Sequence, residues 1–284
     1  MSLFLKMNEV RDQLTNSEQK IVGCILDNNE EVYNLSIQEL AKKCNTSPSS
    51  VVRFCQKMGF EGFQDFKIEL AKEKPDLNKN HSIVYEDVRV DDTIDDIVGK
   101  ISAGNIKSIE NTVELLDRSE VEKAVRVLNN ANNILLYGVG ASGLVAMDFQ
   151  YKLMRINRNA FCYLDSHTQL STAVNIQEND VAVGISHSGK TLEVFKAIEM
   201  ANKKGAKTIS ITRYGDNPLS SISNIKLWSG GKEKNLRVGA IASRIAQLTV
   251  VDILFVGLAQ KDFNTVSEYL KGTRMMVDDF KIKK

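Results

Sequence analysis

Apolar residues in the first quarter of the chain recur at the three- and four-residue spacing of an α-helix, so residues 1 to about 73 are predicted to be all helical. The apolar face of one helix is formed by Ile21, Val22, Ile25 and Leu26, and Ser17 is expected to cap its N-terminus. Its end is predicted at Asn28-Asn29.

Two more helices carry clear start and stop signals. Ser36 precedes the second helix and Glu39 follows three residues later, which is the pattern of a capping box. Ser47 and Pro48 predict the start of a third helix, and Gly59 predicts its end. Because only a short turn separates the second and third helices, the pair has the pattern of a helix-turn-helix.

The polar side of the third helix suits DNA. Its side chains are of the types that hydrogen-bond phosphates and base edges. Together with Ser47, which precedes the helix, the candidate DNA-binding residues are Ser49, Ser50, Arg53, Gln56 and Lys57. We expect Ser49, Ser50 and Arg53 to face the DNA groove and Lys57 to contact a phosphate. A plain three-helix domain with a solvated face remains an alternative, since residues 1–80 contain 11 Lys and Arg against 12 Asp and Glu.

The pattern changes after residue 92. Long helices are predicted over residues 93–116 and 121–128, and then short apolar runs alternate with helical segments, which predicts an α/β domain with a five-stranded parallel sheet flanked by helices. The expected strands are 134–137, 161–164, 181–185, 208–211 and 225–228. Residues 75–92 resemble a linker in composition, so the expected domains are 1–74 and 93–284.

Two of the strand-to-helix turns are rich in glycine and hydroxyl groups. The strand 181–185 is followed by Ser186-His187-Ser188-Gly189-Lys190-Thr191, and an upstream strand is followed by residues 138–143, which include Ser142. Free backbone N–H groups and the positive end of a helix dipole make such turns suitable for a phosphate. We expect Gly189 to let the backbone approach the ligand and His187 to contribute its N–H group. The alternative is that these Ser and Thr residues only cap the following helix.

These motifs resemble known families. Gly140-Ala141-Ser142 with Ser186-x-Ser188-Gly189-x-Thr191 resembles the sugar isomerase (SIS) domain, which binds phosphosugars, and the resemblance implies that Ser142, Ser186, Ser188 and Thr191 are the ligand hydroxyls. Residues 36–70, with Glu39-Leu40-Ala41, Val51-Val52-Arg53-Phe54 and Gly59-Phe60, are similar to the N-terminal domain of RpiR (MurR-type) transcriptional regulators. In that family the segment around Ser243 borders the sugar site, often from a neighbouring subunit, so Ser243 is a further candidate contact.

Composition narrows the possibilities. The 37 Lys and Arg nearly balance the 36 Asp and Glu, so net charge does not predict a nucleic-acid partner. No apolar stretch of ~20 residues and no signal-peptide core are apparent, so a cytoplasmic protein without a membrane span is expected. The four cysteines lack metal or disulfide spacing, and three histidines are too few for a His-rich metal site, so no metal and no cofactor are expected.

The resemblance therefore implies a transcriptional regulator that binds operator DNA and a sugar phosphate effector as a homodimer or a dimer of dimers. An isomerase needs an acid–base pair, and His187 is the only histidine in a proposed ligand loop. A sensor needs only unequal affinity of the ligand for two arrangements of the protein. The alternatives are a phosphosugar isomerase with a helical N-terminal extension, and an adaptor whose helical domain binds protein rather than DNA.

Overall fold

The computed structural model of the chain describes residues 3–11, 14–27, 32, 35–72, 88, 92–231, 240–278 and 280. Two compact units make up the chain, Met1–Val84 and Tyr85–Lys284. The expected linker, residues 75–92, lies outside the described residues except for positions 88 and 92.

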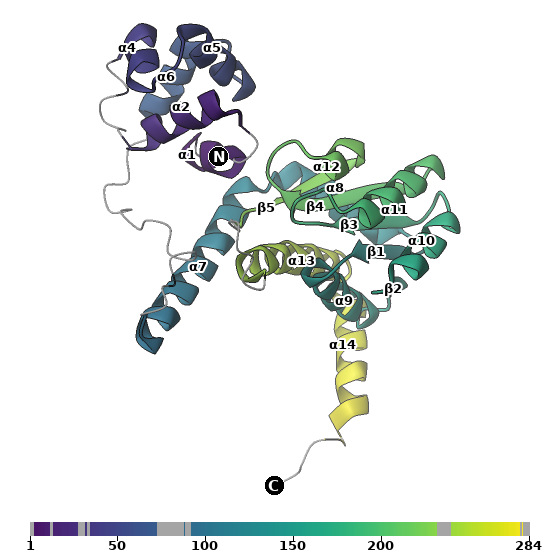
Figure 1. Cartoon of the computed structure of the whole chain (residues 1–284). Helices are drawn as coiled ribbons and strands as arrows, with labels where there is room; N and C mark the ends of the chain where they lie inside the picture. The colour runs from purple at the N-terminus through teal and green to yellow at the C-terminus, as the bar shows by residue number, and fades with distance from the viewer. Residues whose placement is uncertain are drawn as a thin grey trace. The chain divides into compact units, whose positions relative to one another are not determined.

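The N-terminal unit is helical among its described residues (Figure 1). Its helices are α1 (Leu3–Val10), α2 (Asn16–Asp27), α4 (Ile37–Lys43), α5 (Pro48–Lys57) and α6 (Phe63–Lys72). They surround one apolar core in which the rings of Phe54 and Phe66 pack edge to face with centroids 5.7 Å apart. Cys44 and Cys55 are buried in this unit, and all four cysteines are free thiols. Burial raises the pKa of the Cys55 thiol to about 12.

Local capping signals fix most of these helix ends. Ser36 and Glu39 form the predicted capping box, and Ser47 caps α5 with Pro48 at its first position. Gly59 follows α5 with φ of 91°, a conformation that favours glycine. The prediction for α2 was wrong by two residues: the helix begins at Asn16, and Thr15 rather than Ser17 exchanges hydrogen bonds with Glu18.

The C-terminal unit is built on the predicted five-stranded parallel sheet, with strand order β2-β1-β3-β4-β5. The strands are β1 (Ile134–Gly138), β2 (Ala160–Cys162), β3 (Val181–Ile185), β4 (Lys207–Arg213) and β5 (Ile225–Ser229). Its helices are α7 (Ile94–Leu115), α8 (Arg118–Asn130), α9 (Ala141–Met154), α10 (Ser166–Val174), α11 (Leu192–Lys203), α12 (Pro218–Ile222), α13 (Ile241–Lys261) and α14 (Phe263–Asp278).

Helices cover both faces of the sheet (Figure 1). Alternate strand residues such as Leu136 and Val183 pack with α8, α9 and α13, whereas Leu135 and Ala182 pack with α10, α11 and α12. Two apolar layers therefore hold the sheet, as the period-two alternation of a strand requires. α14 extends this unit beyond the sheet.

α13 is the most apolar helix of the described chain. Its length and its mean hydropathy of 1.7 would allow it to cross a membrane, which corrects the statement that no such stretch exists. The helix packs against α7, α8 and α9 and buries Val250, Val251 and Leu254 in the core of the unit. Its composition is accounted for by that packing.

Candidate functional site

The two hydroxyl-rich turns lie side by side at one edge of the sheet. The chain reverses its direction of strand addition between β1 and β3, and Gly138 at the end of β1 is the register partner of Ile185 at the end of β3. Ligands of open parallel sheets bind in the crevice at this switch point, beyond the carboxyl ends of the strands. The turns 139–142 and 186–191 therefore flank the expected binding position.

The two helices that follow β1 and β3 have no side-chain cap. Thr191 precedes α11 and Gly140 precedes α9, and neither helix start receives a side-chain capping hydrogen bond. Within the described residues no hydrogen bond occupies the backbone N–H groups of Ser188, Thr191 or Leu192. By contrast, α4, α5, α7, α8, α10 and α12 are each capped by a side chain. The alternative that Thr191 merely caps α11 is thus wrong, and the N–H groups are left for another acceptor.

The predicted hydroxyls are close to one another and partly bonded among themselves. The Ser186 and Thr191 hydroxyls are 2.9 Å apart, and Ser188 Oγ accepts the Lys190 N–H at 3.2 Å. Ser142 donates to Gln247 Oε1 at 3.1 Å. Ser186 is buried, while Ser142, Ser188 and Thr191 are half-buried, so three of these four hydroxyls remain reachable from outside.

A glycine at residue 189 is required by the contact with Asn217, whereas we expected it to allow close approach of a ligand. Its φ of 64° places it in the left-handed region, and a Cβ there would lie 1.9 Å from Asn217 Oδ1. The space beside Gly189 is thus taken by Asn217 rather than left for a ligand. Asn217 is buried and is itself held by hydrogen bonds with Thr212 and Ser220. The glycine therefore lets the loop rest on the turn that follows β4.

Further polar residues at this edge escaped the sequence analysis. Buried Gln169 donates to the carbonyls of Gly138 and Tyr163, at 2.9 and 2.7 Å, and so ties the turn after β1 to the end of β2. Arg213, at the end of β4, donates its backbone N–H to the His187 carbonyl at 2.9 Å. Because each contact joins segments far apart in sequence, no local motif could have predicted them.

Ser243 is placed near the other site residues but less directly. It is buried in the first turn of α13, one turn before Gln247, on the same face of the helix. Residues 232–239, which precede it, lie outside the described residues. No group of three or more His, Cys, Asp or Glu that could hold a metal occurs in the part of the chain that the structure describes.

The helix-turn-helix unit presents the predicted polar face on α5. Ser49, Arg53, Gln56 and Lys57 are exposed and Ser50 is half-buried, while Val51, Phe54 and Cys55 point into the core. Ser47 is exposed, but its hydroxyl accepts the Ser50 N–H at 3.2 Å. The Ser47 hydroxyl therefore caps α5, which is a structural role and not a DNA contact.

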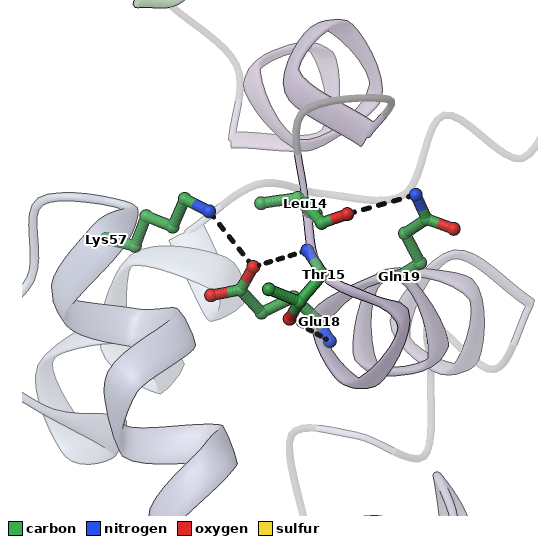
Figure 2. A network of polar contacts seen from close by, with 5 residues as sticks. All are labelled: Leu14, Thr15, Glu18, Gln19 and Lys57. Carbon is green, nitrogen blue, oxygen red and sulfur yellow. Dashed lines mark hydrogen bonds and ion pairs between the residues drawn. The ribbon is translucent and has the colours of Figure 1, made fainter.

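The Lys57 ammonium is held against a carboxylate. Figure 2 shows Glu18 between Thr15 and Lys57: Oε2 accepts the Thr15 N–H at 2.8 Å and the Lys57 ammonium at 3.0 Å. Burial alone would raise the pKa of the Glu18 carboxyl, but the hydrogen bonds from Thr15 and Lys57 outweigh it and hold the pKa below its usual value. The bridge ties the start of α2 to the end of α5.

Comparison with known proteins gives the same division of the chain. The sequence model of the helix-turn-helix domain of the rpiR family matches residues 1–76, and that of the SIS domain matches residues 127–257. An uncharacterised HTH-type transcriptional regulator of Caldanaerobacter subterraneus subsp. tengcongensis is 43% identical over 276 residues, which is 97% of each chain. The uncharacterised HTH-type regulator YbbH of Bacillus subtilis is 32% identical, over 98% of this chain and 97% of YbbH.

Solved structures match the whole chain or its C-terminal unit. The NanR protein of Vibrio vulnificus, solved in complex with ManNAc-6P, is 28% identical with a TM-score of 0.63 and covers 99% of this chain and all of its own. The sugar isomerase domain of an RpiR transcription factor from Sphaerobacter thermophilus, at 17% identity and a TM-score of 0.58, shares the fold over 63% of this chain and 98% of that domain. The chain therefore belongs to the RpiR family of HTH-type transcriptional regulators, with an N-terminal helix-turn-helix domain and a C-terminal SIS domain.

Proposed function

We propose that this regulator binds operator DNA through α5 and a sugar phosphate through the two turns at the β1/β3 switch point. The observation that carries the ligand half is the pair of uncapped helix starts, α9 and α11, at that edge. A phosphate placed there would accept the unoccupied N–H groups and meet the positive ends of two helix dipoles. The hydroxyls of Ser142, Ser188 and Thr191 would add donors that can rotate to fit its oxygens.

The related NanR protein supports a phosphorylated sugar as the ligand class, because it was solved with ManNAc-6P and resembles this chain over its full length. A sensor of this kind needs no catalytic acid–base pair; it needs only different affinities for the ligand in two arrangements of the protein. The solved isomerases that share the SIS fold are less than 25% identical to this chain, so they support the fold and not an activity.

The first half of α7 supports a homodimer as part of this proposal. All residues of α7 are described, and those buried are Ser108, Thr112 and Leu115 in its second half. The same helix face continues toward the N-terminus through Ile101 and Ile97, which are half-buried, and Ile94, which is 74% exposed. A second copy would cover this continuation, and a two-fold dimer would pair two reading helices over an operator with half-sites about one helical turn, or a multiple of it, apart.

The ligand half is tested by calorimetry of the purified protein against N-acetylmannosamine 6-phosphate, glucose 6-phosphate, fructose 6-phosphate, ribose 5-phosphate and arabinose 5-phosphate. We expect at least one to bind, and Ser188→Ala to weaken its binding about tenfold or more without unfolding the domain. Ser171→Ala is the matched control, because that exposed hydroxyl bonds only within α10. Wild-type affinity in the Ser188 variant would remove this site, and turnover of a sugar phosphate would establish an isomerase instead.

A further inference from the structure

We propose that Gln247 binds two neighbouring hydroxyl groups of the sugar. It would thus recognise the carbohydrate part of the ligand, while the N-termini of α9 and α11 bind the phosphate. This rests on the proposed function, because it assigns a residue to the carbohydrate side of the same site. Gln247 lies on α13 and is 1% exposed. Its Oε1 accepts the hydrogen bond of the Ser142 hydroxyl at 3.1 Å.

The carboxamide of Gln247 is only half used. Its Nε2 is buried and has no hydrogen-bond partner among the residues that the structure describes. A buried amide without a partner destabilises the protein that carries it, and the apolar interior along α13 does not require a polar group at this position. Gln247 Nε2 lies in the same side chain that contacts Ser142, a proposed ligand-binding residue. We therefore expect the bound ligand to supply the acceptor that Nε2 lacks.

Ser142 cannot serve Gln247 and a phosphate with the same proton. Its hydroxyl has one hydrogen, which it donates to Gln247 here. If that hydrogen turns toward a phosphate oxygen, Gln247 Oε1 loses its donor and both ends of the carboxamide need new partners. Neighbouring sugar hydroxyls supply them, since one can donate to Oε1 while the other accepts from Nε2.

The Gln247 carboxamide is also chemically better suited to sugar hydroxyls than to the phosphate. A carboxamide is neutral and offers one acceptor beside one donor group, which matches a pair of hydroxyls better than it matches an anion. The phosphate has stronger partners in the N-terminal N–H groups of α9 and α11. Ser243, buried on the same face of α13 one turn earlier, places a second hydroxyl next to Gln247.

The test is Gln247→Met, which keeps the length of the side chain and removes the polar group. We expect the thermal midpoint of the ligand-free variant to stay the same or rise, because the unpaired buried amide is gone. Its affinity for the tightest-binding sugar phosphate of the panel should fall about tenfold or more, whereas its affinity for inorganic phosphate should stay the same or rise, because the variant has no Ser142–Gln247 hydrogen bond to lose. Gln260→Met, on an exposed position of the same helix, is the matched control.

The outcomes distinguish this inference from the proposed function. If the wild-type protein binds no sugar phosphate, the proposed function fails. If the wild type binds one and Gln247→Met binds it equally well, only the role of Gln247 is overturned. The inference is also overturned if the ligand-free variant has a lower thermal midpoint and loses affinity equally for sugar phosphate and for inorganic phosphate. That result would mean that Gln247 has a structural role. Gln247→Leu provides a second variant for the same comparison if the methionine variant does not fold.

Discussion

Asn217 occupies the space that a side chain on residue 189 would need, since a Cβ on Gly189 would lie 1.9 Å from Asn217 Oδ1. The Asn217 amide donates to Thr212 Oγ1 at 3.1 Å and to the Gly215 carbonyl at 3.0 Å. The loop after β3 is thus seated on a hydrogen-bonded turn after β4. This contact fixes the loop before any ligand arrives, which lowers the entropy cost of binding.

Gly189→Ala is expected to destabilise the SIS domain more than Gly205→Ala. Both glycines have positive φ, of 64° and 81°, so both variants carry the conformational penalty of about 1–2 kcal/mol. At residue 205 the nearest atom to an added Cβ is 3.5 Å away, so only residue 189 adds a steric clash. Thermal denaturation should show a larger drop for Gly189→Ala; equal drops would mean that Asn217 moves aside freely.

The features predicted from sequence are those with local causes. Ser36 with Glu39, and Ser47 with Pro48, act within one helix turn, so the sequence alone identifies them. The parallel sheet followed from the alternation of apolar runs and helices. Gln169 and Gln247 were missed because Gly138 and Ser142, which they contact, lie in other segments of the chain, and the contact of Asn217 with Gly189 is equally distant. The error at α2 had a local remedy: Thr15 and Glu18 have the same capping-box spacing as Ser36 and Glu39, whereas Ser17 has Lys20 three residues later.

Arg53→Ala is expected to abolish specific operator binding while sugar phosphate binding stays intact. Arg53 is exposed on α5, where a guanidinium can form a bidentate contact with a base edge worth about 1–3 kcal/mol. The measurement is fluorescence anisotropy with an operator selected from a random DNA library. Lys20→Ala, an exposed cation on α2, should bind nearly as the wild type does. Unchanged operator affinity in Arg53→Ala would refute α5 as the reading helix.

Glu18→Gln is expected to lower the stability of the helix-turn-helix domain near neutral pH but not in acid. The folded-state pKa of Glu18 lies below its ordinary value of 4.5, so the carboxylate stabilises the fold above that pH and loses this effect as the pH falls through the lower pKa. Since the Lys57 side chain is 45% exposed, the effect should not exceed about 1 kcal/mol.

Hydrogen exchange of α2 and α5 amides at about pH 7 and about pH 3 measures this contribution within its own domain. The wild type should exchange more slowly than Glu18→Gln at the higher pH, and this difference should shrink at the lower pH as the carboxyl group takes up a proton. Glu61→Gln, at an exposed carboxylate outside the bridge, should match the wild type at both. A difference that is undiminished in acid would assign the effect to packing instead of charge.

Ile94→Asp combined with Ile101→Asp is expected to convert the dimer to a monomer. The two side chains lie on the continuation of the packed face of α7, and Ile94 is 74% exposed within its own chain. A buried charge at an interface core is strongly unfavourable. Light scattering measures the mass in solution. Ala103→Asp adds charge on the opposite side of the same helix and should leave the dimer intact. If Ala103→Asp dissociates the dimer, or if the double variant remains a dimer, this face of α7 is not the dimer interface.

A sugar phosphate bound at the β1/β3 edge is expected to change the affinity of the helix-turn-helix domain for DNA. This coupling is measured by the anisotropy of the selected operator bound to the full chain, with and without a saturating concentration of the sugar phosphate that binds in calorimetry. We expect operator Kd to change about 5-fold to 150-fold in the wild type. An operator Kd that stays the same at saturation would refute the coupling.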